Sequence, residues 1–165
     1  TIDSKSNLKT IIAPHNVDEA SLCQIELSFH KTVIRWSDLS QQKKEDADIL
    51  LIDCIGILTK IYSYADIAYV GGAMGTKGLH NTLEPAVFGI PILIGKNYTR
   101  YQEVQDLVAL GGIVSVDSSL LFENEFSKIV ADKNLQKEMG LTNLNYIKKQ
   151  AGATSKILLK LKEVY

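Results

Sequence analysis

The fold is decided by the stretch IAYVGGAMGTKGLHNTLEPAVFG, residues 67–89. Its first four residues are apolar or β-forming and predict a buried strand. A glycine-rich loop follows and ends at polar residues that open a short helix, predicted over about 81–88 with Gly89 as its C-cap. A strand that leads through a glycine loop into a helix is typical of a parallel βα unit. Because this junction offers free backbone N–H groups and a positive helix end, it suits the phosphate of a nucleotide or a phosphorylated sugar.

Strands and helices alternate on both sides of this unit. Further strands are predicted near residues 10–13, 32–36, 49–52, 91–94 and 113–116, and further helices near 18–30, 56–64, 101–110, 119–132, 134–150 and 153–164. This alternation favours right-handed βαβ units, and therefore an α/β, Rossmann-like open parallel sheet flanked by helices. Residues 1–8 are interpreted as a linker and residues 9–165 as one domain. Leu27 is expected in the core, and the Leu/Ile stripe of the last helix is expected to pack on this domain or on another one.

Composition narrows the class of protein. The 165 residues are 45% hydrophobic and 22% charged with a formal net charge of −1, which is ordinary for a soluble globular domain. No basic patch of the kind that nucleic acids require is visible. Cys23 and Cys54 lack CxxC spacing, which argues against a zinc site or a disulfide framework and favours a reducing compartment. There is no secretory signal and no apolar run near the ~20 residues of a membrane span. Because the chain begins without Met, we expect it to be a fragment of a longer protein.

The glycine loop matches neither of the common phosphate-binding motifs. The spacing Gly72-x-x-Gly75-x-x-Gly78 differs from GxGxxG, and Lys77 is not followed by the Ser or Thr of a P-loop. One interpretation is a turn that requires positive φ. The other is a loop whose missing side chains let the backbone approach a phosphate.

The residues after the loop also allow two interpretations. Asn81 and Glu84 resemble a capping box, with Asn81 as the N-cap and Glu84 at the third helical position. In a binding site, Glu84 would accept hydrogen bonds from ribose hydroxyls, because a carboxylate accepts two side by side. Asn81 and neighbouring backbone N–H groups would then bind phosphate oxygens. The two interpretations are compatible.

Two other loops follow predicted strands. Residues 14–16 follow the first strand, and residues 53–57 follow the strand at 49–52. Since ligands bind at the carboxyl ends of parallel strands, these loops and the segment 71–84 are expected to converge on one edge of the sheet. Their convergence predicts a nucleotide pocket.

The motifs together resemble a known family. Residues 13–15, 53–56, 64–72 and 78–85 are similar to the C-terminal half of the Kdo (3-deoxy-D-manno-octulosonic acid) transferases of lipid A and lipopolysaccharide biosynthesis. The resemblance implies a GT-B glycosyltransferase, built from two facing Rossmann-like domains, with this chain as the C-terminal, donor-binding domain. The implied donor is CMP-Kdo, and the implied acceptor is a lipid A precursor bound through the N-terminal domain.

The resemblance also implies a set of CMP-binding residues. They are Pro14, His15, Ile55, Gly56, Ile57, Gly72, Lys77, His80, Asn81, Thr82, Leu83 and Glu84. The family commonly has Pro-Arg-His where this chain has Pro14-His15-Asn16, and Gly-Glu-Leu where it has Gly56-Ile57-Leu58. We hypothesise that Lys77 supplies the missing positive charge. The family's presumed catalytic base is a Glu of the N-terminal domain, so this chain is expected to hold no catalytic residue, no metal and no cofactor.

Other functions remain open at this stage. A different GT-B transferase, or an epimerase, could use a UDP- or ADP-sugar, and a non-catalytic nucleotide-sugar-binding module is a further alternative. The family acts at the cytoplasmic face of the bacterial inner membrane. The chain by itself is expected to be soluble and inactive, with its own N-terminal domain as a partner and no nucleic acid.

Overall fold

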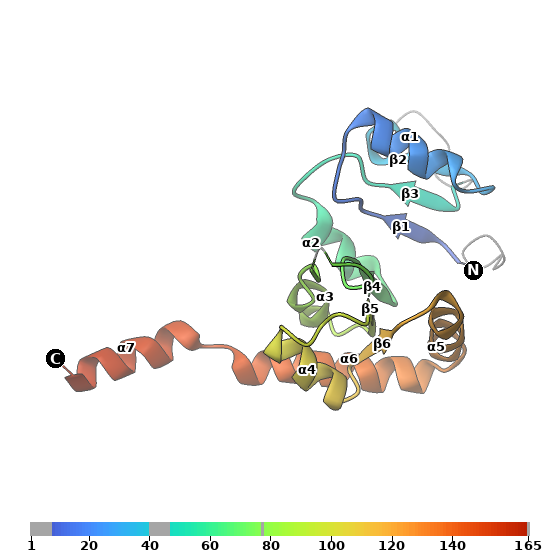
Figure 1. Ribbon diagram of the computed structural model, residues 1–165. Coiled ribbons are helices and arrows are strands. Elements are labelled where there is room, and N and C mark those ends of the chain that lie inside the picture. The colour runs from blue at the N-terminus through green and yellow to red at the C-terminus, as the bar shows by residue number, and fades with distance from the viewer. Residues whose placement is uncertain (1–7, 40–46, 77, 165) are drawn as a thin grey trace. The chain divides into compact units, whose positions relative to one another are not determined.

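The computed structural model describes residues 8–39, 47–76 and 78–164, without the side chains of 154–156, 163 and 164 (Figure 1). The chain divides into two compact units, unit 1 (Thr1–Lys60) and unit 2 (Ile61–Tyr165). Each unit is described by itself. The expected linker falls almost entirely on residues outside the described ranges, as does Lys77.

Unit 1 is a small parallel sheet with one main helix. Its elements are β1 (Thr10–Ile12), α1 (Glu19–Leu27), β2 (Val33–Arg35), η1 (Trp36–Asp38) and β3 (Ile49–Leu51). The short α2 (Leu58–Ile61) spans the boundary between the two units in the sequence. The strand order is β1-β3-β2, and both pairings are parallel. Asp18 caps α1 by accepting a hydrogen bond from the Ser21 N–H over 3.0 Å. The core of this unit is made of Leu22, Ile34, Ile49, Leu51 and Ile52.

Unit 2 holds the remaining elements. In chain order they are η3 (Tyr62–Tyr64), β4 (Ala68–Val70), α3 (Leu83–Val87), β5 (Ile92–Gly95), α4 (Gln102–Ala109), β6 (Ile113–Val116), α5 (Ser119–Ala131), α6 (Lys133–Gln150) and α7 (Ala153–Val164). The strand order is β4-β5-β6, again all parallel. All four residues of β5 are buried, as expected for a central strand covered on both faces.

Helices cover both faces of the unit 2 sheet. Alternate strand residues, among them Val70, Ile92 and Ile94, pack with residues of α3 and α4 in one apolar cluster. Leu93 and Val116 point to the other face and pack with residues of α5. Figure 1 shows α3 and α4 on the opposite side of this sheet from α5, with the long α6 running beneath both groups. The alternation of apolar residues along the strands therefore determines which helices pack on each face of the sheet.

Glycines terminate two of these helices. Gly89, at φ +65°, follows α3, and Gly111, at φ +81°, follows α4. After α4, the N–H groups of Gly111 and Gly112 donate to the carbonyls of Val108 and Leu107, which is a Schellman motif. The end of α3 was predicted from the position of Gly89.

The predicted fold class, parallel strands flanked by helices, is confirmed. The described strands form two sheets of three, where the sequence predicts one open sheet. Sequence periodicity identifies a strand without identifying its neighbour, so the pairing had to come from the structure.

Some burial predictions were wrong. Tyr69, in a strand predicted to be buried, is 47% exposed, and Leu27 is 87% exposed. Leu27 is five residues after the buried Leu22, which at 3.6 residues per turn places it on a different face of α1. The apolar residues Ile157, Leu158 and Leu161 of α7 are exposed, so they do not pack on this domain, and the alternative that they pack on another domain stays a prediction. Among the described residues, no helix is both long and apolar enough to cross a bilayer.

Candidate functional site

The carboxyl edge of the unit 1 sheet carries the first group of predicted site residues. β1 and β3 are neighbours, and the Ile52 N–H donates to the Ile12 carbonyl over 2.8 Å just where the two strands end. The loops that hold Pro14 and His15, and Ile55 to Ile57, therefore leave the sheet at the same edge. His15 is exposed, Ile55 is 88% exposed, and Gly56 has φ +95° with open space where a side chain would be. These two loops follow neighbouring strands at one edge of the sheet, as predicted.

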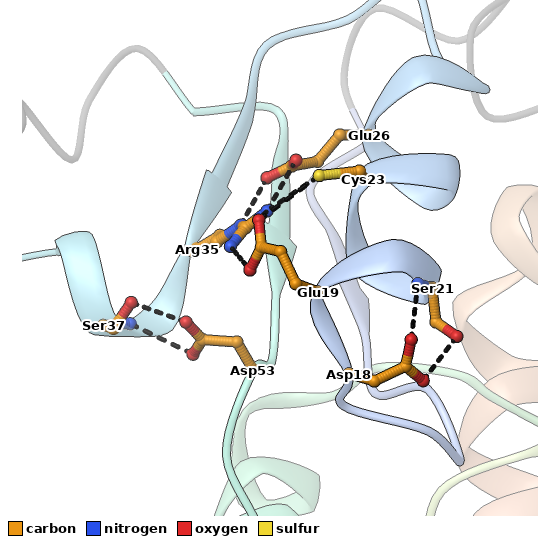
Figure 2. Close-up of polar contacts among 8 residues, drawn as sticks. All are labelled: Asp18, Glu19, Ser21, Cys23, Glu26, Arg35, Ser37 and Asp53. Atoms are coloured by element: carbon orange, nitrogen blue, oxygen red, sulfur yellow. Dashed lines mark hydrogen bonds and ion pairs between the residues drawn. The ribbon is translucent and has the colours of Figure 1, made fainter.

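An ion-pair cluster lies at the same edge, at the end of β2. Nη1 and Nη2 of Arg35 each donate to Glu19 over 2.8 Å, and Nε and Nη2 donate to Glu26 over 2.7 and 2.9 Å (Figure 2). The hydrogen bonds from Arg35 lower the pKa of Glu19 to about 2. Because two carboxylates surround Arg35, it does not replace the free positive charge that the family motif would supply.

The cluster was missed by sequence reasoning, although the sequence carries a signal for it. Glu19, Cys23 and Glu26 lie at i, i+4 and i+7 and so share one face of α1. Their side chains meet the last residue of β2, and Cys23 Sγ donates to Glu19 over 3.3 Å. At the end of β3, the Asp53 carboxylate accepts hydrogen bonds from the N–H and the hydroxyl of Ser37 over 3.2 and 2.5 Å (Figure 2). These acidic side chains serve the internal structure of unit 1.

The glycine loop of unit 2 is closed at its neck. Gly72 has φ +94°, and a Cβ there would overlap the carbonyl oxygen of Gly78. The His80 N–H donates to the Gly71 carbonyl over 3.1 Å, which joins the two ends of the loop. The interpretation of Gly72 as a turn that needs positive φ is confirmed. Gly75 has open space around it and no positive φ.

Residues at the end of β5 and just after it hold the middle of this loop. The backbone of Ala73 and Met74 passes so close to Gly95 that a Cβ on Gly95 would overlap it. Asn97 donates its backbone N–H to the Ala73 carbonyl and its side-chain Nδ2 to the Gly75 carbonyl, both over 2.9 Å. Asn97 was not among the predicted site residues, and nothing in its local sequence signals this contact.

The capping box after the loop differs from the predicted one. α3 begins at Leu83, so the N-cap position belongs to Thr82, whose side chain makes no capping hydrogen bond. Asn81 acts from one residue earlier, because its Oδ1 accepts the Leu83 N–H over 3.0 Å. Glu84 is the second residue of α3, not the third, and accepts from Asn81 Nδ2 over 3.0 Å. With five residues, α3 has a smaller dipole than a long helix.

The side chains of this segment face different ways. His80 and Asn81 are exposed, and Glu84 is half-buried. Thr82 is only 2% exposed, and Leu83 packs against the core, so these two side chains are turned into unit 2. What Thr82 and Leu83 can offer a ligand is their backbone.

Two tyrosines lie close to this segment and were not predicted as site residues. Burial, together with the nearby charge of Glu84, raises the pKa of Tyr62. The centroid of the Tyr62 ring lies 6.2 Å from the centroid of the Phe88 ring. The hydroxyl of Tyr101 lies 3.0 Å from where a Cβ on Gly78 would be. The predicted residues thus form two groups, one in each unit, and the convergence of the two groups stays a prediction.

Comparison with known proteins identifies what the chain resembles. No protein-family model matches it. A 3-deoxy-D-manno-octulosonic acid transferase of Haemophilus influenzae is 26% identical over 158 residues, which cover 94% of this chain and 37% of that protein. A transferase of the same name from Aquifex aeolicus is 30% identical over 108 residues, covering 65% of this chain and 29% of that protein. The resemblance to the Kdo transferases is confirmed.

A solved structure supports the same conclusion for the fold. The crystal structure of the C-terminal CMP-Kdo binding domain of WaaA from Acinetobacter baumannii superimposes with a TM-score of 0.77 and 19% identity, over 88% of this chain and 77% of that one. The predicted Rossmann-like α/β fold is thereby confirmed, whereas its place as one half of a GT-B enzyme stays a prediction. The chain spans well under half the length of the two transferases.

Proposed function

We propose that this chain is the donor-binding domain of a Kdo transferase and holds CMP-Kdo. The observation that carries the proposal is the shared fold with a CMP-Kdo binding domain over 88% of the chain. The similarity to a Kdo transferase over 94% of the chain supports the proposal. The matched part of the chain includes the predicted site residues of both units.

The two groups of residues would bind different parts of the donor. Glu84 would accept hydrogen bonds from the ribose hydroxyls, because a half-buried carboxylate is a strong acceptor for a diol. The exposed loops at Pro14, His15 and Ile55 to Ile57 would contact the nucleotide from unit 1. The backbone N–H groups of Asn81 and Thr82 would face the phosphate, since those of His80 and Leu83 already donate to Gly71 and Asn81. Lys77 would add the positive charge that a short helix does not supply.

In the proposed reaction, the acceptor hydroxyl attacks the anomeric carbon of Kdo. The bond from that carbon to the phosphate oxygen breaks, CMP leaves, and the acceptor proton passes to a base. Donors near the phosphate would stabilise its growing negative charge. We place the base and the site for a lipid A precursor in an N-terminal domain, at the cytoplasmic face of the inner membrane. This chain alone would bind the donor without turning it over, and the proposal requires no metal or cofactor.

Calorimetric titration of the chain with CMP, UMP and ADP tests the proposal. We expect CMP to bind more tightly than the other two. A preference for UMP or ADP would instead favour a transferase or epimerase that uses a UDP- or ADP-sugar. A chain that binds none of the three contradicts the proposal that residues 9–165 suffice to hold the donor.

A substitution makes the test specific to the site. Glu84→Gln replaces a charged acceptor by a neutral one, and the loss of a charge-assisted hydrogen bond predicts about ten-fold weaker CMP binding. Glu138→Gln changes the same residue type at an exposed position of α6 and is the matched control. Equal CMP affinity of the two variants would remove Glu84 from the site.

A further inference from the structure

Asn81 makes two hydrogen bonds with the residues that follow it. Its Oδ1 accepts the Leu83 N–H, and its Nδ2 donates to Oε1 of Glu84, each over 3.0 Å. The side chain is therefore held by the first turn of α3 at one end and holds a carboxylate at the other. An amide fixed in this way has a defined direction, although the residue is exposed.

The bond to Glu84 fixes one oxygen of the carboxylate. Within the described residues, Oε2 of Glu84 makes no hydrogen bond, and Oε1 keeps a second lone pair beside the one that Asn81 uses. Tyr62 lies near enough for the charge of Glu84 to help raise its pKa, so an aromatic residue of η3 adjoins the carboxylate. Both oxygens can therefore accept from a ligand while the carboxylate stays in one orientation.

We infer that Asn81 is a positioning residue that orients the Glu84 carboxylate toward the ribose hydroxyls of the nucleotide, and that it is not a phosphate ligand. This inference rests on the proposed function and revises the role that the sequence suggested for Asn81. A vicinal diol presents two O–H donors side by side, which match the two oxygens of a fixed carboxylate. Since orienting a group before the ligand arrives reduces the entropy lost on binding, removing Asn81 weakens the contact that Glu84 makes.

The competing role is a direct bond to the phosphate. Asn81 Nδ2 has a second hydrogen that the bond to Glu84 does not use. Three ligands separate the two roles: CMP, cytidine, which lacks the phosphate, and 2′,3′-dideoxy-CMP, which lacks both ribose hydroxyls. A positioning residue affects the ligands that carry the diol, whereas a phosphate ligand affects those that carry the phosphate.

The variant Asn81→Asp suits this test. Its side chain can still accept the Leu83 N–H and keep the turn, but it places a second carboxylate beside Glu84 where Asn81 donates. We expect CMP and cytidine each to bind about five-fold more weakly or worse, and 2′,3′-dideoxy-CMP to bind as it does to the parent. Asn145→Asp makes the same change at an exposed position of α6 and is the matched control. Circular dichroism establishes that all variants are folded.

A second variant separates the loss of the hydrogen bonds from the effect of the negative charge that aspartate adds. Asn81→Ala removes both hydrogen bonds without adding charge and should give the same ligand pattern. In a Glu84→Gln background, either Asn81 substitution should have little further effect, because the group that Asn81 orients is already altered.

The outcomes are distinct. Loss of CMP and 2′,3′-dideoxy-CMP binding with unchanged cytidine binding assigns Asn81 to the phosphate and overturns the inference. Equal loss for all three ligands, or an additive effect in the Glu84→Gln background, also overturns it. If the parent chain binds CMP but Asn81 behaves in either of these ways, only the positioning role fails. If the parent binds none of the three ligands, the proposed function fails first.

Discussion

Arg35 is the most heavily paired side chain that the structure describes in unit 1. It is the last residue of β2, and it joins two carboxylates of α1 to the edge of the sheet (Figure 2). Because Arg35 and Glu26 are partly buried, their pair is screened less than an ion pair in open solvent. The cluster therefore fixes α1 against β2.

The pairing predicts a pH dependence of stability. The pKa of Glu19 is about 2 in the folded chain and has an ordinary value of 4.5, so its stabilising contribution is present above about pH 4.5 and is lost as the pH falls through about 2. We expect Arg35→Gln to lower the urea midpoint at pH 7 and to lower it less near pH 2. Arg100→Gln, at an exposed position, is the control. A difference between Arg35→Gln and the parent that is the same at both pH values would contradict this account.

The sequence identified the residue types of the site more readily than their partners. The pattern of Asn81 and Glu84 predicted a capping box at a helix start, and both residues do lie at the start of α3, but their side chains bond to each other directly. Which atoms meet depends on where α3 begins, and one or two residues at a helix end are beyond the accuracy of a sequence pattern. The role of Lys77 stays a prediction, because it lies outside the described residues.

At the scale of elements, the glycine loop between β4 and α3 is the feature on which the site depends. Its neck is closed by Gly72 and Gly78, and its middle is held by Gly95 and Asn97. Spacing alone showed that the glycines were unusual. It could not show that the loop passes close to β5, where only a glycine, Gly95, leaves room for the backbone of Ala73 and Met74.

Two alanine substitutions in one loop test this description. Gly72→Ala forces a side chain onto a residue with φ +94° and against the Gly78 carbonyl, so we expect it to cost about 1–3 kcal/mol and to weaken CMP binding. Gly75→Ala meets open space and should change stability by less than about 0.5 kcal/mol. Urea unfolding and calorimetry measure both effects. Equal stability of the two variants would mean that the neck of the loop does not require a glycine at position 72.

At the scale of the whole molecule, one buried amide links distant parts of unit 2. Asn143 of α6 is fully buried, and its Nδ2 donates to the carbonyls of Ile90 and Gly112 over 2.8 and 2.9 Å. These carbonyls precede β5 and β6 respectively. Gly112 has no side chain at the place where a Cβ would overlap Asn143 Oδ1. The helix is thereby fixed to the amino ends of two neighbouring strands.

Removing this amide should destabilise unit 2. Asn143→Ala leaves two buried carbonyls without a donor and a small cavity, which predicts a loss of about 2–4 kcal/mol in the free energy of unfolding. Asn145→Ala, at an exposed position two residues later on α6, should change it by less than about 0.5 kcal/mol. Urea denaturation of both variants measures the difference. A loss below 1 kcal/mol for Asn143→Ala would show that water replaces the missing donor.

The sequence by itself determined the class of fold, the order of strands and helices, and the resemblance to the Kdo transferases. These properties depend on local patterns: apolar runs make strands, glycines end helices, and the residues of each motif are contiguous. The tertiary structure decided which strands are neighbours, which glycines close the loop at 71–80, and that Asn81 contacts Glu84. It also revealed Arg35, Asn97 and Asn143, whose partners lie between 9 and 53 residues away. Contacts at such separations depend on how the helices pack on the sheets, and a local pattern of residues carries no record of that packing.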